Sequence, residues 1–181
     1  NDFERYIQSG GGYLGIHAAT DCEYNWPWYG MLAGAFFLDH PSSPSNVQNG
    51  TFTVVDKNSF ATKGMPDQFE RKDEFYNFKS INPAIHVVVT LDESSYTGGK
   101  NGKDHPISWY HEFEGGRSFY TAMGHTNESF SEPLVLNHIW SGLNYVMRGD
   151  APQAIDYSKA KPEENRFTKV VLAEKLNEPV E

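Results

Sequence analysis

The 181-residue sequence contains only one cysteine, Cys22. A single cysteine excludes a disulfide within the chain, but it leaves the redox compartment open because many exported proteins also lack disulfides. No neighbouring residue marks Cys22 as a nucleophile, so we interpret it as a packing residue.

Long apolar runs and basic patches are missing as well. No run approaches the roughly 20 apolar residues of a membrane span, and no secretory signal opens the sequence. Lysine and arginine are scattered, and the net charge is −9, which argues against a nucleic-acid partner because such binding depends on neutralising phosphates. We therefore predict neither a membrane span in this chain nor binding to nucleic acid.

What is present is the composition of a folded domain. Hydrophobic residues make up 38% of the chain and charged residues 22%, which suits a sizeable core. We predict one domain over residues 1–149, a polar, proline-bearing linker over 150–166, and the first strand of a following domain over 167–181. The opening residues resemble the interior of a domain, so we expect an N-terminal strand and helix to be missing from this chain.

The hydrophobic pattern predicts alternating helices and strands. The helices are expected over 2–9, from Pro27 through Ala33, and from Pro133 to Met147, the last with Ser131 as a possible cap and a buried stripe of Val135, Ile139, Leu143, Val146 and Met147. The strands are expected over 13–17, 51–56, 73–78, 85–91, 107–113 and 117–125, with a turn or short helix at 60–66 and loops at 36–46 and 94–106. The run at 85–91 is apolar throughout, as in a central strand that is covered on both faces. The last two strands flank Glu114-Gly115-Gly116 and predict a β-hairpin.

His17 is the expected centre of a functional site. It ends the buried strand at 13–17, and the small residues Ala18 and Ala19 allow a sharp turn toward a helix. A polar residue at such a turn projects from the edge of a sheet, where open α/β sheets bind their ligands. Asp21 follows four residues later and is a second candidate.

Further histidines and acids end strands or lie in glycine-rich loops, and we expect several of these loops to meet at one edge of the sheet. They are Asp39 and His40, Asp104 and His105, and His125 with Glu128, the last pair in the segment GHTNE. Imidazole and carboxylate can bind zinc or a similar divalent ion, and they can equally act as a general acid–base pair. We interpret His86 and His138 as structural residues, and His111 as a residue either of the core or of the layer that supports the site.

Aromatic residues amount to 14% of the chain. Trp26, Trp28 and Tyr29 lie close in sequence to the expected site, where aromatic rings could hold a sugar. They could equally attach their helix to the sheet, and the sequence leaves both interpretations open.

Six ordered segments resemble the ThuA-like (trehalose utilisation) family over roughly residues 1–149. They are GIHAATD, WPWYG, DEFYNF, TLDESSYTGG, DHPISWYHEFEGGRSFYT and GHTNESF. The resemblance implies the flavodoxin-like, three-layer α/β sandwich of class I glutamine amidotransferases. In those enzymes the strand-to-helix turn carries a cysteine nucleophile partnered by a later histidine and glutamate. Here His17 occupies the turn and His125 and Glu128 resemble the later pair, so glutaminase chemistry is not expected.

The resemblance implies action on a sugar or an oxidised (keto) sugar. His17, His125 and Glu128 would be the acid–base groups, or His17, His125 and His40 would ligate a divalent metal such as zinc. The sugar would be bound by Asp21, Trp26, Trp28, Tyr29 and His105. The alternative is a non-catalytic, amidotransferase-like module that binds carbohydrate or docks onto an adjoining domain.

The tail ENRFTKVVLAEKLNEPVE resembles the opening strand of quinoprotein-type sugar-dehydrogenase β-propellers. This resemblance implies a multidomain bacterial protein whose partner is that adjoining propeller. Such proteins are exported, so the expected location is the periplasm or the cell surface.

Overall fold

The computed structural model describes residues 2–149 and 154–160. Its α-helices are α1 (Asp2–Gln8), α2 (Pro27–Ala33) and α3 (Pro133–Val146). Its strands are β1 (Gly12–Ile16), β2 (Phe36–Asp39), β3 (Val47–Val54), β4 (Gln68–Glu74), β5 (Asn77–Lys79), β6 (His86–Asp92), β7 (Pro106–Phe113) and β8 (Gly116–Thr121). Short 3₁₀ helices are η1 (His17–Thr20), η2 (Phe60–Thr62), η3 (Glu93–Ser95), η4 (Gly102–Asp104), η5 (Asn127–Ser131) and η6 (Tyr157–Lys159). Within the described residues, no helix is long and apolar enough to cross a bilayer.

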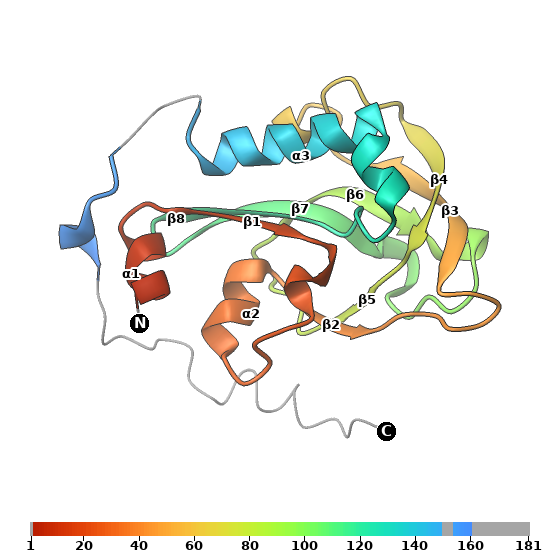
Figure 1. Ribbon diagram of the computed structural model, residues 1–181, viewed down its shortest axis with the longest axis horizontal. Coiled ribbons are helices and arrows are strands. Elements are labelled where there is room, and N and C mark those ends of the chain that lie inside the picture. Colours follow the sequence, from red (N-terminus) through yellow and green to blue (C-terminus); the bar gives the residue numbers. More distant parts are fainter. Residues whose placement is uncertain (1, 150–153, 161–181) are drawn as a thin grey trace.

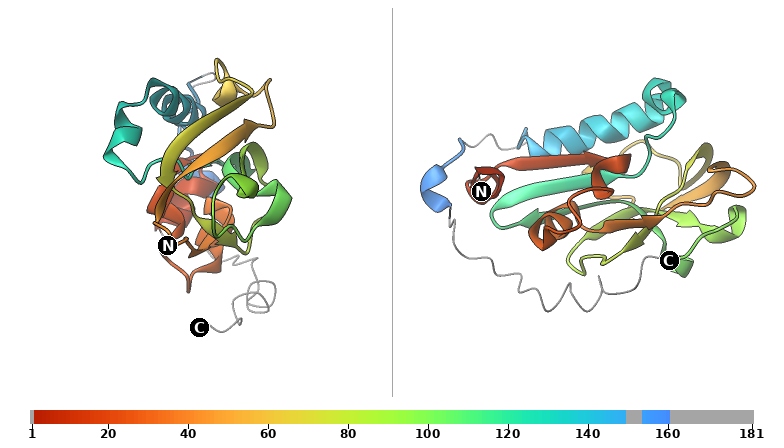
Figure 2. Two further views of the ribbon diagram at one scale, coloured as in Figure 1. Left: turned by 90° about the vertical axis from the view of Figure 1, so that its right-hand side faces the viewer. Right: turned by 60° about the horizontal axis from the view of Figure 1, so that its bottom comes forward.

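Six of the strands form one mixed sheet in the order β1-β8-β7-β6-β3-β4. In this sheet β1 and β8 run parallel, with Ile16 beside Thr121 at their carboxyl ends, and the other neighbouring pairs of the described strands are antiparallel. The remaining strands, β2 and β5, form a small antiparallel pair. The sheet curls along its width, and β1 and β4 are its two edges (Figures 1 and 2).

Helices cover the sheet on both faces, which gives the three layers that the sequence predicted. Helix α3 lies along one face, and α1 and α2 lie on the other (Figure 1). Under α3, Phe119 packs so closely that a Cβ at Gly142 would lie 2.3 Å from its ring. On the opposite side, the rings of Trp109 and Tyr120 stack with centroids 4.4 Å apart. The fold is therefore a mixed α/β sandwich of the flavodoxin-like and amidotransferase-like kind.

Glycine and proline set the ends of the shorter helices, as the sequence indicated. Pro27 occupies the first turn of α2, where its missing N–H has no helical acceptor to lose. Gly34 ends α2 at φ +97°, and its N–H bonds to the carbonyl of Gly30. A Cβ at Gly34 would also lie 2.2 Å from Nε1 of Trp109, so the tight approach of α2 to β7 requires glycine here.

Several predicted boundaries were wrong for identifiable reasons. The segment 73–78 is not one strand, because the chain leaves the large sheet after Glu74 and enters the small one at Asn77. The predicted loop 36–46 begins with strand β2.

The last helix also differs in detail from its prediction. Glu132, not Ser131, is the N-cap of α3, and it makes no side-chain capping bond. The side chain of Met147 lies outside the predicted buried stripe and is 69% exposed. The tail at 167–181, and most of the predicted linker at 150–166, fall outside the described residues.

His138 is structural, as the sequence suggested, and it makes stability depend on pH. It lies on α3 fully enclosed, with Nδ1 2.6 Å from the carbonyl oxygen of Ala61 and Nε2 2.7 Å from Oγ of Ser108. Burial lowers its pKa from 6.5 to about 4, because the low-dielectric interior disfavours the charged form.

We expect the free energy of unfolding to fall as the pH drops from 6.5 toward 4. In this window the unfolded chain binds a proton that the folded chain excludes, so the stabilisation is complete above pH 6.5 and is lost on acidification by up to about 3 kcal/mol. Urea unfolding at pH 7.0 and 4.5 measures it. The H138Q variant should show a flatter pH dependence, whereas H86A, which removes an exposed histidine, should keep the original slope. Equal slopes in H138Q and the parent would contradict this assignment.

Candidate functional site

His17 lies at a strained turn between β1 and η1. Its backbone has φ +43°, a left-handed conformation that costs non-glycine residues roughly 1–3 kcal/mol and is concentrated at functional sites. The hydroxyl of Tyr120 donates a 2.7 Å hydrogen bond to the carbonyl oxygen of His17. The side chain is 6% exposed, so the turn holds a buried imidazole at the carboxyl end of β1.

Glu74 supplies the carboxylate that faces this imidazole. It is the last residue of β4 and is 5% exposed at its side chain. Oε1 of Glu74 accepts a 2.9 Å hydrogen bond from Nδ2 of Asn46. Oε2 is left to face His17 and His125.

His125 reaches the same point from the loop after β8. The loop passes so close to β1 that a Cβ at Gly124 would lie 2.6 Å from Cγ2 of Ile16, so only glycine fits there. The side chain of His125 is 37% exposed, and it therefore forms the solvent side of the site.

Asp73 holds the loop after β8 through hydrogen bonds to its backbone. Its carboxylate accepts backbone N–H bonds from Gly124, His125 and Thr126 at 3.0, 3.2 and 3.3 Å. The same carboxylate is paired with the guanidinium of Arg71, and both side chains are buried. Asp73 thus links the end of β4 to the loop that carries His125.

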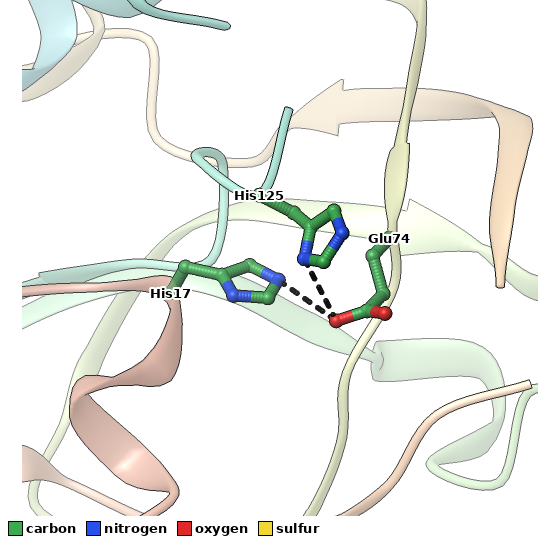
Figure 3. Close-up of side chains that lie close together, drawn as sticks. All are labelled: His17, Glu74 and His125. Atoms are coloured by element: carbon green, nitrogen blue, oxygen red, sulfur yellow. Dashed lines mark ion pairs between the residues drawn. The ribbon is translucent and has the colours of Figure 1, made fainter. Parts of the chain in front are cut away.

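Figure 3 shows the resulting triad of His17, Glu74 and His125. Oε2 of Glu74 lies 3.1 Å from Nδ1 of His125 and 3.6 Å from Nε2 of His17. The two imidazole centroids are 5.1 Å apart. These three ligand atoms all lie within 4.8 Å of one another, which is the spacing of a candidate metal-binding group.

The electrostatics of the triad keep His17 neutral. Burial lowers the pKa of His17, and the carboxylates of Asp73 and Glu74 oppose that shift only in part. The buried Nε2 atom of His17 has no hydrogen-bond partner among the described residues. His17 therefore presents a neutral ring nitrogen that is free to bind a proton, a substrate or a cation.

Aromatic and histidine rings complete the wall beside the triad. The ring centroid of Tyr76 lies 4.0 Å from that of His17 and 4.3 Å from that of Phe37. His40, directly after β2, is about one-third exposed, and its Nε2 lies 3.7 Å from Oε1 of Glu74. His40 thus contacts the carboxylate oxygen opposite to the one that His17 and His125 share.

The family model described as trehalose utilisation (ThuA) matches residues 1–146. The chain belongs to the ThuA family. No curated protein matches it. The six resembling segments therefore identified the family correctly.

Solved structures of ThuA-like proteins have the same fold. A protein from Bacteroides uniformis ATCC 8492 matches with a TM-score of 0.65 and 27% identity, over 80% of this chain and 62% of that one. One from Parabacteroides merdae ATCC 43184 matches with a TM-score of 0.62 and 18% identity, over 84% of this chain and 66% of that one. This ThuA chain therefore spans a little less than two thirds of the length of either protein.

The structure brings together two of the predicted site residues of this ThuA chain, His17 and His125, and places His40 beside them. Glu128 does not join them, because His125 pairs with Glu74 and the exposed Glu128 lies on η5. It lines a separate hollow of about 430 Å³ with Val47, Glu70, Arg71, Lys72, Thr126 and Glu132. Asp21 is exposed and accepts a hydrogen bond from the hydroxyl of Tyr24.

The aromatic residues of α2 and its N-cap bond to neighbouring elements, and their role in holding a sugar stays a prediction. Trp28 stacks edge-on against Phe3 and Phe113 and donates a 2.9 Å bond to Glu114. Trp26 bonds to Glu4 of α1 at 3.1 Å, and the hydroxyl of Tyr29 donates to the carbonyl of Ala19 at 2.6 Å.

His105 supports the site from behind. It is fully buried, with Nε2 2.8 Å from the carbonyl oxygen of Tyr76 and Nδ1 2.8 Å from Glu93. It therefore positions the Tyr76 backbone and does not face the triad. Asp39 pairs with Lys100, and the thiol of Cys22 contacts Ala19 and Tyr29.

Sequence reasoning missed Glu74, Asp73 and Tyr76. The available signal was the acidic pair in the segment DEFYNF, two carboxylates placed directly before an aromatic run. An acid inside a predicted strand is normally assigned to a solvated face. Here both acids are buried, at 1% and 4% exposure, and buried carboxylates need partners.

Proposed function

We propose that this ThuA domain acts on a carbohydrate, either a sugar or a keto sugar, at the triad of His17, Glu74 and His125. The observation that carries the proposal is the convergence of these three groups from β1, β4 and the loop after β8. The family description, trehalose utilisation, supports a carbohydrate as the ligand.

The triad has the chemistry that reactions at sugar oxygens require. Imidazole and carboxylate move protons to and from hydroxyl or carbonyl oxygens near neutral pH. The same groups can hold a cation that polarises such an oxygen. In either case the reacting oxygen would be placed at Oε2 of Glu74 and the two ring nitrogens that face it.

The surroundings are suited to a ligand that enters from solvent. His125 and His40 are each about one-third exposed, at 37% and 35%, whereas His17 and Glu74 are enclosed. A sugar ring would therefore meet the two outer imidazoles first and direct one of its oxygens inward.

Replacing His17 by alanine is expected to lower turnover of the active sugar by at least about 100-fold, because acid–base groups typically contribute 10²–10⁴-fold. The assay compares 3-keto disaccharides with unmodified disaccharides. H86A is the matched control, since His86 pairs with Asp56 at the surface, 2.7 Å away, and not with the triad. Unchanged turnover in H17A would contradict the proposal.

The sequence also allows a carbohydrate-binding module without catalysis, and a sugar titration of the parent protein distinguishes the two functions. Saturable sugar binding in calorimetry, with no product from any sugar tested, would favour the binding module. The adjoining propeller as partner and the periplasmic or cell-surface location stay predictions.

A further inference from the structure

Glu74 is a buried carboxylate without a permanent cation. In the described part of the chain, its ion pairs are all with histidines: His17, His40 and His125. Its other partner, Asn46, is a neutral amide. Buried charges in proteins are paired or coordinate a metal, because an uncompensated ion is costly to remove from water.

The neighbouring acid, Asp73, does have a permanently charged partner. Asp73 is paired with the guanidinium of Arg71, and Arg71 bonds in turn to Glu132 at 3.1 Å. Arg71 is therefore committed to other carboxylates, and among the described residues the negative charge of Glu74 faces histidines alone.

His17 adds a second, independent observation. Its side chain is 94% buried, since 6% is exposed, and its Nε2 points toward Oε2 of Glu74 at 3.6 Å. That separation is too long for a hydrogen bond, and Nε2 has no other partner among the described residues. An unsatisfied buried ring nitrogen normally costs about 1–3 kcal/mol.

A single ion between these atoms would satisfy both groups. We propose that Nε2 of His17, Oε2 of Glu74 and Nδ1 of His125 bind one divalent transition-metal ion, with zinc as the best fit. Two ligand atoms at about 2.0–2.2 Å from a tetrahedral zinc lie roughly 3.3–3.5 Å apart. The observed separations from Oε2, 3.1 and 3.6 Å, bracket that value.

The ligand set is that of a reactive site and not a purely structural one. Two imidazoles and one carboxylate are the ligands of catalytic zinc sites that keep a fourth position open. The partly exposed face of His125 leaves that position toward solvent. Asn46 and His40 hold the other oxygen of Glu74, as outer groups orient carboxylate ligands at metal sites.

This inference deepens the proposed function and rests on it for the chemistry alone. When bound, zinc would act as a Lewis acid on a sugar oxygen or on water. The binding of the ion itself is independent of any sugar and can be measured without one.

The test is titration of the chelator-treated full chain with zinc chloride, followed by calorimetry and by elemental analysis after dialysis. We expect about one zinc per chain in the parent protein. H17A and E74Q should lower the affinity by at least about 100-fold, and H40N by about 10-fold, because loss of outer partners typically costs 10–100-fold. H86A, which alters a surface histidine–carboxylate pair, should bind as the parent does.

Thermal unfolding guards against misfolded variants. Zinc should raise the Tm of the parent and of H86A, because an ion that binds only the folded state stabilises it. It should leave the Tm of E74Q unchanged while circular dichroism shows a folded chain. No stoichiometric zinc in the parent, or equal affinity in E74Q and the parent, would overturn the proposal.

The two proposals can fail separately. Zinc bound at the triad without turnover of any sugar would support the metal site and count against the carbohydrate reaction. Sugar turnover that persists without zinc, in a protein that does not bind it, would support the reaction and overturn the metal site.

Discussion

Replacing Glu74 by glutamine is expected to lower sugar turnover by at least about 100-fold while the protein stays folded. Glutamine has nearly the same shape and can still accept the hydrogen bond from Asn46 at Oε1. It removes the negative charge that faces both imidazoles, at 3.1 Å from His125 and 3.6 Å from His17. Steady-state kinetics with the active sugar, alongside circular dichroism, measures the effect.

Two matched carboxylates sharpen this experiment. Glu70 lies on the same strand, β4, but is exposed, so E70Q should keep turnover within about threefold of the parent, in line with surface substitutions away from special features. E128Q tests the carboxylate that the sequence favoured. If E128Q loses turnover and E74Q does not, the triad described here is not the reaction centre.

Replacing Asp73 by alanine is expected to lower the free energy of unfolding by about 3–5 kcal/mol, the usual cost of breaking a buried ion pair by removing one partner. The change removes one of the two carboxylates that pair with the guanidinium of Arg71, which is 7% exposed, and leaves Glu132, 3.1 Å away, as the other. It also releases the N–H groups of Gly124, His125 and Thr126 from their acceptor. Urea unfolding followed by fluorescence provides the measurement.

A double-mutant cycle separates the ion pair from the loop contacts. The R71A/D73A chain should be less destabilised than the sum of the single variants, because residues in one network are not additive. If the double variant loses as much free energy of unfolding as the two single variants together, the ion pair contributes little to stability. A loss under about 1 kcal/mol in D73A would show the same.

The meeting of His17 and His125 could be predicted because local rules determine it. Both residues follow strand ends, and β1 and β8 run parallel with Ile16 beside Thr121. Parallel neighbours deliver the residues after their carboxyl ends to the same edge of a sheet, so polar residues at two such ends meet there.

Glu74 could not be predicted in the same way. It ends β4, the strand at the opposite edge of the six-stranded sheet from β1, and only the curl of the whole sheet brings it to His17. The sequence favours Glu128 because it is three residues from His125, but Glu128 lies on η5 and lines a different surface. Residues three apart in sequence are neighbours in space within a helix, but not across a turn.

The break in segment 73–78 illustrates a second limit. Period-two alternation marks a strand with one covered face, whereas Phe75 and Tyr76 are consecutive and both buried, at 2% and 5% exposure. They lie where the chain passes between two sheets. Hydrophobicity alone does not distinguish such a passage from a strand covered on both faces.

The placement of β1 and β4 at the two outer edges has a consequence for assembly. His17 and Glu74 lie beside each other only when every intervening strand is paired with its neighbours, so the triad depends on the whole sheet. Local opening of either edge strand would therefore separate these side chains without global unfolding. Activity at the triad is therefore expected only while all six strands of the sheet remain paired.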